Sequence, residues 1–490
     1  MLSLALLIVR LASLVIVAQP GYTDAYYYAS VAERLARGDG LTADFVWNFL
    51  EAPGLAPLPV ASHRFWMPLV SAAAAAGIAV LGPLLGAFRA GQVPIVLAAA
   101  FIPWLTWRAA RALGASPNAA LVAAGLAGLG GLFAPAWVAF DGFAPAAFLG
   151  TAFFLAYRGA ANGSVRLGLG AGLACGLLYL ARAEGALFGL ALLALLARPA
   201  ARRAGIAGCL AALAVGAAWF ARGALAGGVG DAVARGLFLV RYEDFFALRP
   251  VVAGALLAAP GDALAVRAQA LAGDAVTAAA ALMFLLVPAL AVGLWAGRRR
   301  PEVRAFAQLA FAIYLVEGIL WPLHATRGSY FHSLAAFFPY AVALSAAGGE
   351  RWLVPRGLAT LRLASGGAVA VALILSAAAL QQWDTAFNGP LGVRIAALDA
   401  IPPGPLLAID AGAWRWIASR PALVTPADGL AAAACVARAY GARSVVLEAA
   451  HFQAYGPLYR GAERPAWLGA PIERGPVRVF PVISLPPCVQ

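Results

Sequence analysis

The stretch ASGGAVAVALILSAAAL, residues 364–380, carries no charge and is long and apolar enough to form a membrane-spanning helix. Arg351, Arg356 and Arg362 precede it, and a more polar region begins at Gln381. Runs of the same kind fill most of the chain before it. Further spans are expected at 2–18, 91–107, 118–134, 143–157, 165–181, 185–197, 204–220, 275–296, 305–323 and 330–347.

The composition of the whole chain agrees with these runs. Of the 490 residues, 63% are hydrophobic and 12% charged, with a mean hydropathy of +0.83. Soluble domains are about 45–50% apolar and about 25% charged, so a soluble enzyme, a disordered chain and a fibrous protein are excluded. The net charge of +13 comes from arginines that are spread thinly. We therefore expect no nucleic-acid partner.

The apolar segment 67–86, which contains Pro68 and Pro83, decides the topology. If it lies at the interface or re-enters, all dense short-loop arginine clusters face the cytoplasm, as the positive-inside rule requires. These clusters are Arg108 and Arg111; Arg158 and Arg166; Arg198, Arg202 and Arg203; Arg298, Arg299, Arg300 and Arg304; and Arg351, Arg356 and Arg362. The expected fold is a mainly α, polytopic membrane helical bundle of about 11 transmembrane helices. Its expected location is the bacterial cytoplasmic (inner) membrane, with the N-terminus inside.

Three long segments then lie outside the cytoplasm: 19–90, 221–274 and 381–490. In the last, short apolar runs at 406–409, 422–424, 444–447 and 477–482 alternate with turns and a helical stretch at 428–440. This rhythm predicts a small extracytoplasmic α/β domain, so the expected domains are 1–380 and 381–490.

Four cysteines have no metal-ligand spacing. Cys175 and Cys209 lie in apolar runs, where they serve as small hydrophobic residues. Cys435 and Cys488 can pair if their region is extracytoplasmic, although burial as free cysteines is the more common outcome.

Two acidic residues mark the same expected outer surface. Asp24 follows the first span in Tyr-Thr-Asp-Ala-Tyr-Tyr-Tyr (22–28), before an amphipathic helix that ends near Gly38. Asp141 lies in the loop between the third and fourth spans. Two carboxylates at one surface suit general acid–base chemistry or a divalent metal. The alternative is that each only caps the helix that follows it.

Arginines and histidines near the same surface suggest an anion. Arg182-Ala-Glu184 joins two apolar segments, and guanidinium groups suit phosphate. A local Arg182–Glu184 pair is the alternative. The loop 321–332 contains His324, Arg327 and His332; its alternative role is interfacial anchoring through its aromatic residues.

Other polar residues are less specific. Glu51, His63 and Arg64 end the first outer segment and either complete the same site or anchor the interface. Glu317 lies inside an expected span and requires a partner that the sequence does not name.

These elements, in this order, resemble the GT-C membrane glycosyltransferases, in particular the bacterial dolichyl-phosphate-mannose–protein mannosyltransferase-like and aminoarabinose-transferase-like proteins. The resemblance covers the order of elements over about 350 residues and the outer C-terminal region. The matching motifs are Asp24-Ala-Tyr26-Tyr27, Phe65-Trp66-Met67-Pro68-Leu69, Asp141-Gly142, Arg182-Ala-Glu184-Gly185, and Arg327 with Pro339.

The resemblance implies transfer of a sugar, with inversion, from a polyprenyl-phosphate carrier to a lipid, glycan or protein acceptor outside the membrane. It implies that Asp24 is the base and that Asp141 supports the site. Arg182 or Arg327 would bind the leaving phosphate. The remaining candidates for substrate or phosphate binding are Tyr27, Glu51, His63, Arg64, Glu184 and His324. His63-Arg64 only approximates the family's usual basic pair. Members differ in metal use, so a divalent metal is possible and none is assigned.

Two other classes of protein fit the composition. A transporter or flippase is expected to carry charged residues and broken helices at the membrane midplane, and only Glu317 fits that pattern. A non-catalytic scaffold with an outer binding domain is the second alternative. The gathering of acidic residues at one surface favours the transferase.

Overall fold

The computed structural model describes residues 2–226, 229–249, 254, 257–485 and 488. The chain forms two compact units. The first contains residues 1–18, 66–225 and 267–383, and the second contains 19–65, 226–266 and 384–490. The second unit is thus assembled from parts of the three segments that the sequence places outside the membrane. The expected division at residue 380 stays a prediction.

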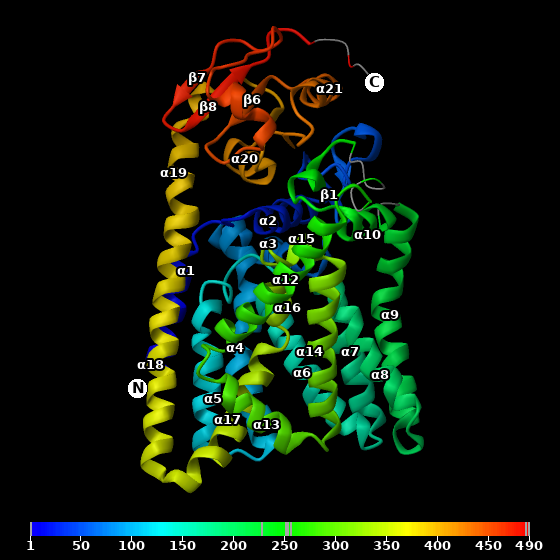
Figure 1. Ribbon diagram of the computed structural model, residues 1–490, viewed down its shortest axis with the longest axis vertical. Helices are drawn as coiled ribbons and strands as arrows, with labels where there is room; N and C mark the ends of the chain where they lie inside the picture. The colour runs from blue at the N-terminus through cyan, green and yellow to red at the C-terminus, as the bar shows by residue number, and fades with distance from the viewer. Residues whose placement is uncertain (1, 227–228, 250–253, 255–256, 486–487, 489–490) are drawn as a thin grey trace. The chain divides into compact units, whose positions relative to one another are not determined.

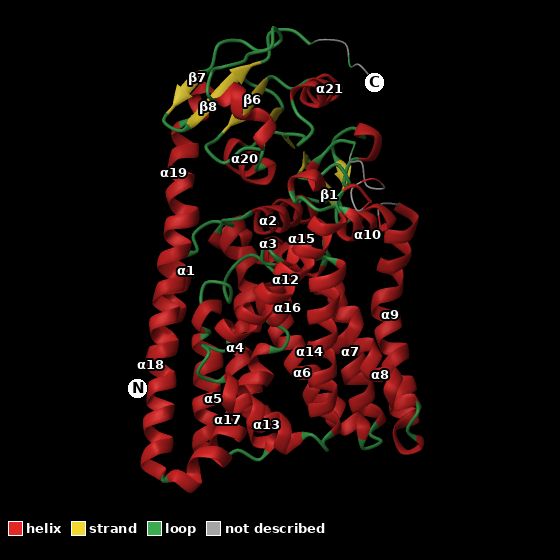
Figure 2. Ribbon diagram, in the orientation of Figure 1, coloured by secondary structure: helices red, strands yellow, loops and turns green. Residues whose placement is uncertain are grey.

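The first unit is built of helices (Figures 1 and 2). They are α1 (Leu2–Ile16), α3 (Leu69–Leu85), α4 (Ala87–Leu113), α5 (Pro117–Leu129), α6 (Phe143–Ala161), α7 (Val165–Ala181), α8 (Phe188–Leu196), α9 (Arg202–Ala226), α12 (Pro260–Ala281), α13 (Val287–Gly297), α14 (Pro301–Leu315), α15 (Pro322–Ala325), α16 (Ser329–Leu334), α17 (Phe338–Leu353) and α18 (Leu358–Trp383). Helices α9 and α12 run past the boundary of this unit.

Among the described residues, four helical stretches are long and apolar enough to cross a membrane: Ala87–Leu113, Pro199–Ala224, Pro301–Leu320 and Leu358–Ala396. Shorter apolar helices accompany them, among them α1, α3, α5 and α7. Large apolar side chains on these helices are exposed, such as Leu210 and Leu363, as expected for surfaces that face lipid. The protein is therefore membrane-embedded and mainly helical. The number of spans, the sidedness and whether α3 crosses stay predictions.

Several expected spans are not continuous helices; the span at 118–134, for example, is interrupted at Gly130, whose φ angle is 84°. The span at 275–296 is divided between α12 and α13 at Met283 and Phe284, whose φ angles are 57° and 52°. The span at 305–323 ends in a π-helical turn, Val316–Leu320, and the span at 330–347 is divided between α16 and α17. Apart from Glu317 in the π-helical turn, the residues at these breaks are mostly apolar, so hydropathy does not distinguish the breaks from helix.

Glycines allow the helices of the first unit to approach closely. A Cβ atom at Gly172 on α7 would lie 2.1 Å from the carbonyl oxygen of Gly208 on α9. A Cβ atom at Gly348 on α17 would lie 2.1 Å from the carbonyl oxygen of Ala289 on α13. Backbones in direct contact are the usual result of small-residue interfaces in membranes. Close helix packing therefore requires glycine at these positions.

The second unit combines helices with a sheet. Its helices are α2 (Thr23–Ala36), α10 (Val229–Phe238), α19 (Gly389–Ala396), α20 (Ala411–Ala418), α21 (Leu430–Tyr440) and α22 (Gly456–Tyr459). Its strands are β1 (Thr42–Ala43), β2 (Phe45–Val46), β3 (Val60–Ala61), β4 (Leu406–Ala408), β5 (Ala422–Val424), β6 (Ser444–Leu447), β7 (Ile472–Arg474) and β8 (Val477–Pro481).

Six of these strands form one sheet in the order β2-β5-β4-β6-β8-β7. The first four are parallel, with Leu406 opposite Ala422 and Ser444, while β8 and β7 are antiparallel. Strand β2 belongs to the first outer segment, so the sheet joins residues far apart in the chain. A two-residue strand has too little alternation to be recognised in the sequence.

Cys435 on α21 and Cys488 form a disulfide bond. The expectation that they are more often buried as free thiols was wrong for this pair, because the fold brings their Cα atoms to 4.8 Å. Cys175 and Cys209 are free, as expected from their apolar runs.

Candidate functional site

Glu51 is the most buried carboxyl group among the candidates of the second unit, with 1% of its surface exposed. Its Oε2 accepts a hydrogen bond from the Tyr27 hydroxyl at 3.1 Å. Its Oε1 accepts from the backbone N–H groups of Arg64 and Phe65, each at 3.2 Å. Desolvation raises the pKa of Glu51 to about 7, and these hydrogen bonds limit the rise because they stabilise the carboxylate. Glu51 therefore holds the end of the first outer segment against α2.

His63 is part of the same arrangement. Its backbone N–H donates to the Tyr27 hydroxyl at 2.5 Å, and its ring stacks on Tyr28 with centroids 6.0 Å apart. Its φ angle of 58° is in the left-handed region, which a non-glycine residue adopts only where the surroundings hold it. The structure thus brings Tyr27, Glu51, His63 and Arg64 together, mainly through backbone atoms.

Asp24 lies in the first turn of α2 and is partly exposed. The N-cap of this helix is Tyr22, so Asp24 is not the cap. The positive end of the helix dipole stabilises a negative charge at this position. Residues 25–32 of α2 are buried, which fixes the backbone that carries Asp24.

Helix α20 holds α2 in the second unit. Arg415 donates to both carboxylate oxygens of Asp44, at 2.8 and 3.2 Å, and pairs with Glu33 on α2 at 3.4 Å. A Cβ atom at Gly412 would lie 3.2 Å from the Cβ of Tyr26. These residues position α2, and the sequence gives no signal of them because Arg415 and Asp44 are 371 residues apart.

In the first unit, Asp141 precedes α6 and is 1% exposed. Its Oδ1 accepts from the Gly142 N–H at 2.5 Å, and its Oδ2 lies 3.4 Å from Nδ1 of His332. The N-cap of α6 is Gly142, so the capping alternative does not hold for Asp141. An imidazole beside a buried carboxylate is the arrangement that orients a base or a metal ligand.

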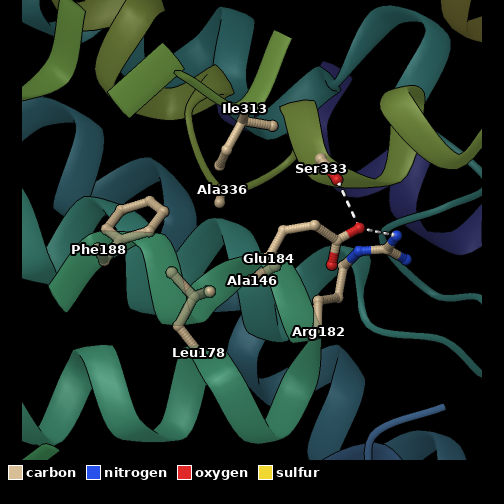
Figure 3. Close-up of a pocket in the computed structure, with 9 residues that line it drawn as sticks. Ala146, Leu178, Arg182, Glu184, Phe188, Ile313, Ser333 and Ala336 are labelled. Carbon is tan, nitrogen blue, oxygen red and sulfur yellow. Dashed lines mark hydrogen bonds and ion pairs between the residues drawn. The ribbon is translucent and has the colours of Figure 1, made fainter. Parts of the chain in front are cut away.

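Arg182 and Glu184 form a second polar cluster in the first unit (Figure 3). Nη2 of Arg182 lies 2.7 Å from Oε1 of Glu184, so the local ion pair expected as the alternative is present. The Ser333 hydroxyl is 3.0 Å from the same carboxylate oxygen. Both charged residues line a pocket whose other walls are mainly apolar: Ala146, Leu178, Gly185, Phe188, Ile313 and Ala336. Ser333, which the sequence did not single out, completes the polar end of this pocket.

His324 and Arg327 follow the π-helical turn in the first unit. Desolvation lowers the pKa of His324 to about 4, so its imidazole is neutral at pH 7 and interacts with anions only as a hydrogen-bond donor. Arg327 lies in a turn and is exposed. Of the two, only Arg327 supplies a positive charge for an anion.

The ten candidates therefore fall into two groups. Tyr27, Glu51, His63 and Arg64 meet in the second unit, where Tyr27 belongs to α2, the helix that also carries Asp24. Asp141, Arg182, Glu184, His324 and Arg327 belong to the first unit. Their membership in one active site stays a prediction.

No protein-family model and no curated protein sequence matches the chain. Solved structures do match. ArnT from Cupriavidus metallidurans in the apo state aligns with a TM-score of 0.60 at 14% identity, over 98% of this chain and 97% of that one. The Archaeoglobus fulgidus oligosaccharyltransferase in complex with zinc and sulfate aligns with a TM-score of 0.57 at 14% identity, over 95% and 71%.

A structure of the archaeal oligosaccharyltransferase AglB from Archaeoglobus fulgidus, bound to an inhibitory peptide and a dolichol-phosphate, has a TM-score of 0.56 at 14% identity, over 91% and 69%. At this identity the likeness is one of fold. The chain has the fold of the GT-C membrane glycosyltransferases, and the resemblance read from its motifs is confirmed at that level.

Proposed function

We propose that the protein is a glycosyltransferase that moves a sugar from a polyprenyl-phosphate donor to an acceptor on the extracytoplasmic side of the bacterial inner membrane. The observation that carries the proposal is the fold match to ArnT, which extends over nearly the full length of both chains. The acceptor is a lipid, a glycan or a protein. The transporter, flippase and scaffold alternatives receive no comparable support.

The proposed reaction is an inverting displacement. Asp24 takes the proton of the acceptor hydroxyl, whose oxygen attacks the anomeric carbon while the bond from that carbon to the phosphate oxygen breaks. Asp24 is partly exposed at a helix N-terminus, which suits an ionised general base. Asp141 supports the site. The departing lipid phosphate develops charge that a preorganised guanidinium stabilises, and the candidates are Arg64, Arg182 and Arg327.

A divalent metal is compatible with the donor types at Asp141 and His332, a carboxylate oxygen and an imidazole nitrogen that lie 3.4 Å apart. These two would hold such an ion within the first unit. It would supply Lewis-acid stabilisation of phosphate oxygens, and no step above depends on it.

The sidedness of the proposal has separate support. The Cys435–Cys488 disulfide belongs to residues after Leu358–Ala396, the last of the four stretches long and apolar enough to cross a membrane, and disulfides persist outside the reducing cytoplasm. The arginine clusters mark the loops on the opposite side. Together they favour an extracytoplasmic location for residues 384–490.

The test uses purified protein in lipid nanodiscs with polyprenyl-phosphate-linked sugars that carry a radiolabel. We expect labelled acceptor and free lipid phosphate to appear in equal amounts. Asp24→Asn is expected to lower turnover by about 10²–10⁴-fold, the usual contribution of a general base. Asp39→Asn is the matched control, because Asp39 is exposed beyond the end of the same helix; its turnover should equal that of wild type.

Release of no lipid phosphate from any such donor would contradict the proposed activity. Full turnover by Asp24→Asn would leave the activity in place and remove Asp24 as the base.

A further inference from the structure

Three polar side chains from separate elements lie in a row in the first unit. Glu184 belongs to the turn after α7, Ser333 to α16 and Glu317 to the π-helical turn after α14. The Ser333 oxygen is 3.0 Å from Oε1 of Glu184, and it is also hydrogen-bonded to Oε1 of Glu317. Glu184 is the partner of Arg182 (Figure 3).

The protons in this row can be counted. A serine hydroxyl has one proton and can donate only once, whereas an ionised carboxylate can only accept. Ser333 lies between two carboxyl groups, so one of them must donate to its oxygen. Glu184 is 2.7 Å from the Arg182 guanidinium, which favours its ionised form. The donor is therefore Glu317.

The surroundings of Glu317 lead to the same assignment. Its surface is 2% exposed, and its Oε2 is buried without a hydrogen-bond partner among the described residues. A charged oxygen in that position carries a large desolvation cost. A second buried carboxyl group is close by: Oδ2 of Asp274 would lie 3.6 Å from a Cβ atom at Gly318, the residue next to Glu317.

We propose that Glu317 is a neutral carboxylic acid that donates to Ser333 and thereby orients Glu184 on Arg182. Glu317 is then a positioning residue for the phosphate ligand, and this role rests on the proposed function. The net charge of the cluster explains why a neutral Glu317 favours phosphate binding. With Glu317 neutral, the row and Arg182 sum to zero charge; with Glu317 ionised, the sum is −1, which opposes the binding of an anionic phosphate.

The protonation state is tested by infrared spectroscopy of the purified protein, which needs no activity. We expect wild type to show the carbonyl stretch of a buried protonated carboxyl group and Glu317→Gln to lose that component. Glu302→Gln is the matched control, because Glu302 is equally buried on α14 but has a cation 3.8 Å away in Arg158. That variant should keep the band. An unchanged carboxylic-acid band in Glu317→Gln overturns the proposal.

The positioning role is tested by kinetics with the polyprenyl-phosphate-linked sugar. Glu317→Gln keeps a donor toward Ser333, so its KM for the donor lipid should stay within twofold of wild type. Glu317→Ala and Ser333→Ala should each raise that KM about tenfold, the effect of losing one hydrogen bond in a charged network. A loss in Glu317→Gln as large as in Glu317→Ala overturns the role. If no variant and no wild type turns over, the proposed function has failed, while the infrared result still decides the state of Glu317.

Discussion

Glu51 makes the folding stability of the protein depend on pH. Its pKa in the folded chain is about 7, against 4.5 for the ordinary side chain, because burial disfavours the charged form. Between these pH values the unfolded chain loses the proton and the folded chain keeps it. Stability therefore falls as pH rises from about 4.5 to 7 and is constant above that range.

Glu51→Gln should remove this loss. We expect the free energy of unfolding of wild type to fall by up to roughly 3 kcal/mol between pH 4.5 and 7, and that of Glu51→Gln to change less over the same range. Thermal unfolding in detergent at several pH values measures the difference. An identical pH slope for the two proteins would show that folding does not raise the pKa of Glu51. Glu463→Gln provides a control at an exposed site.

The sequence identified these residues by type but not by partner. It marked Glu51 as a residue that either completes the site or anchors the interface, and Glu317 as a carboxyl group inside an expected span. The partners of Glu51 are backbone N–H groups and a tyrosine 24 residues away, and backbone groups leave no mark in a sequence. The partner of Glu317 is Ser333, an ordinary residue in a helix that hydropathy merged with its neighbour.

At the scale of elements, hydropathy located the helices and missed their interruptions. The division between α12 and α13 falls on Met283 and Phe284, which are as apolar as the helices they separate. The backbone N–H groups at this break still donate to nearby carbonyl oxygens, for example that of Phe284 to Ala279 at 2.7 Å, so they are satisfied without a regular helix. Hydropathy records side chains and carries no information on these backbone bonds, so the sequence pattern could not reveal the break.

The packing of α7 on α9 gives a test at this scale. Gly172→Ala places a Cβ atom 2.1 Å from the Gly208 carbonyl oxygen, so the helices must separate. We expect a loss of about 1–3 kcal/mol, typical of overpacking, seen as a lower unfolding temperature. Gly170→Ala is the control on the same helix, because its nearest atom would be at 3.9 Å. That change should leave stability equal or slightly higher, since alanine favours helix. Equal effects of both changes would argue against close packing here.

At the scale of the whole molecule, the arginine clusters predict that the loop at 298–300 is cytoplasmic and that residues 384–490 are extracytoplasmic. If the segment 67–86 crosses the membrane as an additional span, both assignments are reversed. The length of α3 alone does not decide between the two topologies. Single cysteines placed in a background without Cys175 and Cys209 test this directly. Glu463 and Arg299 are both exposed and suit the substitution.

In intact spheroplasts, a membrane-impermeant maleimide should label Glu463→Cys and leave Arg299→Cys unlabelled until the membrane is opened. The Cys435–Cys488 disulfide is retained, because it offers no thiol to the reagent. Labelling of Arg299→Cys alone in closed spheroplasts would reverse the topology. It would also place residues 384–490 in the reducing cytoplasm, where a disulfide does not persist. The labelling pattern therefore tests the arginine rule and the compartment of the disulfide in one measurement.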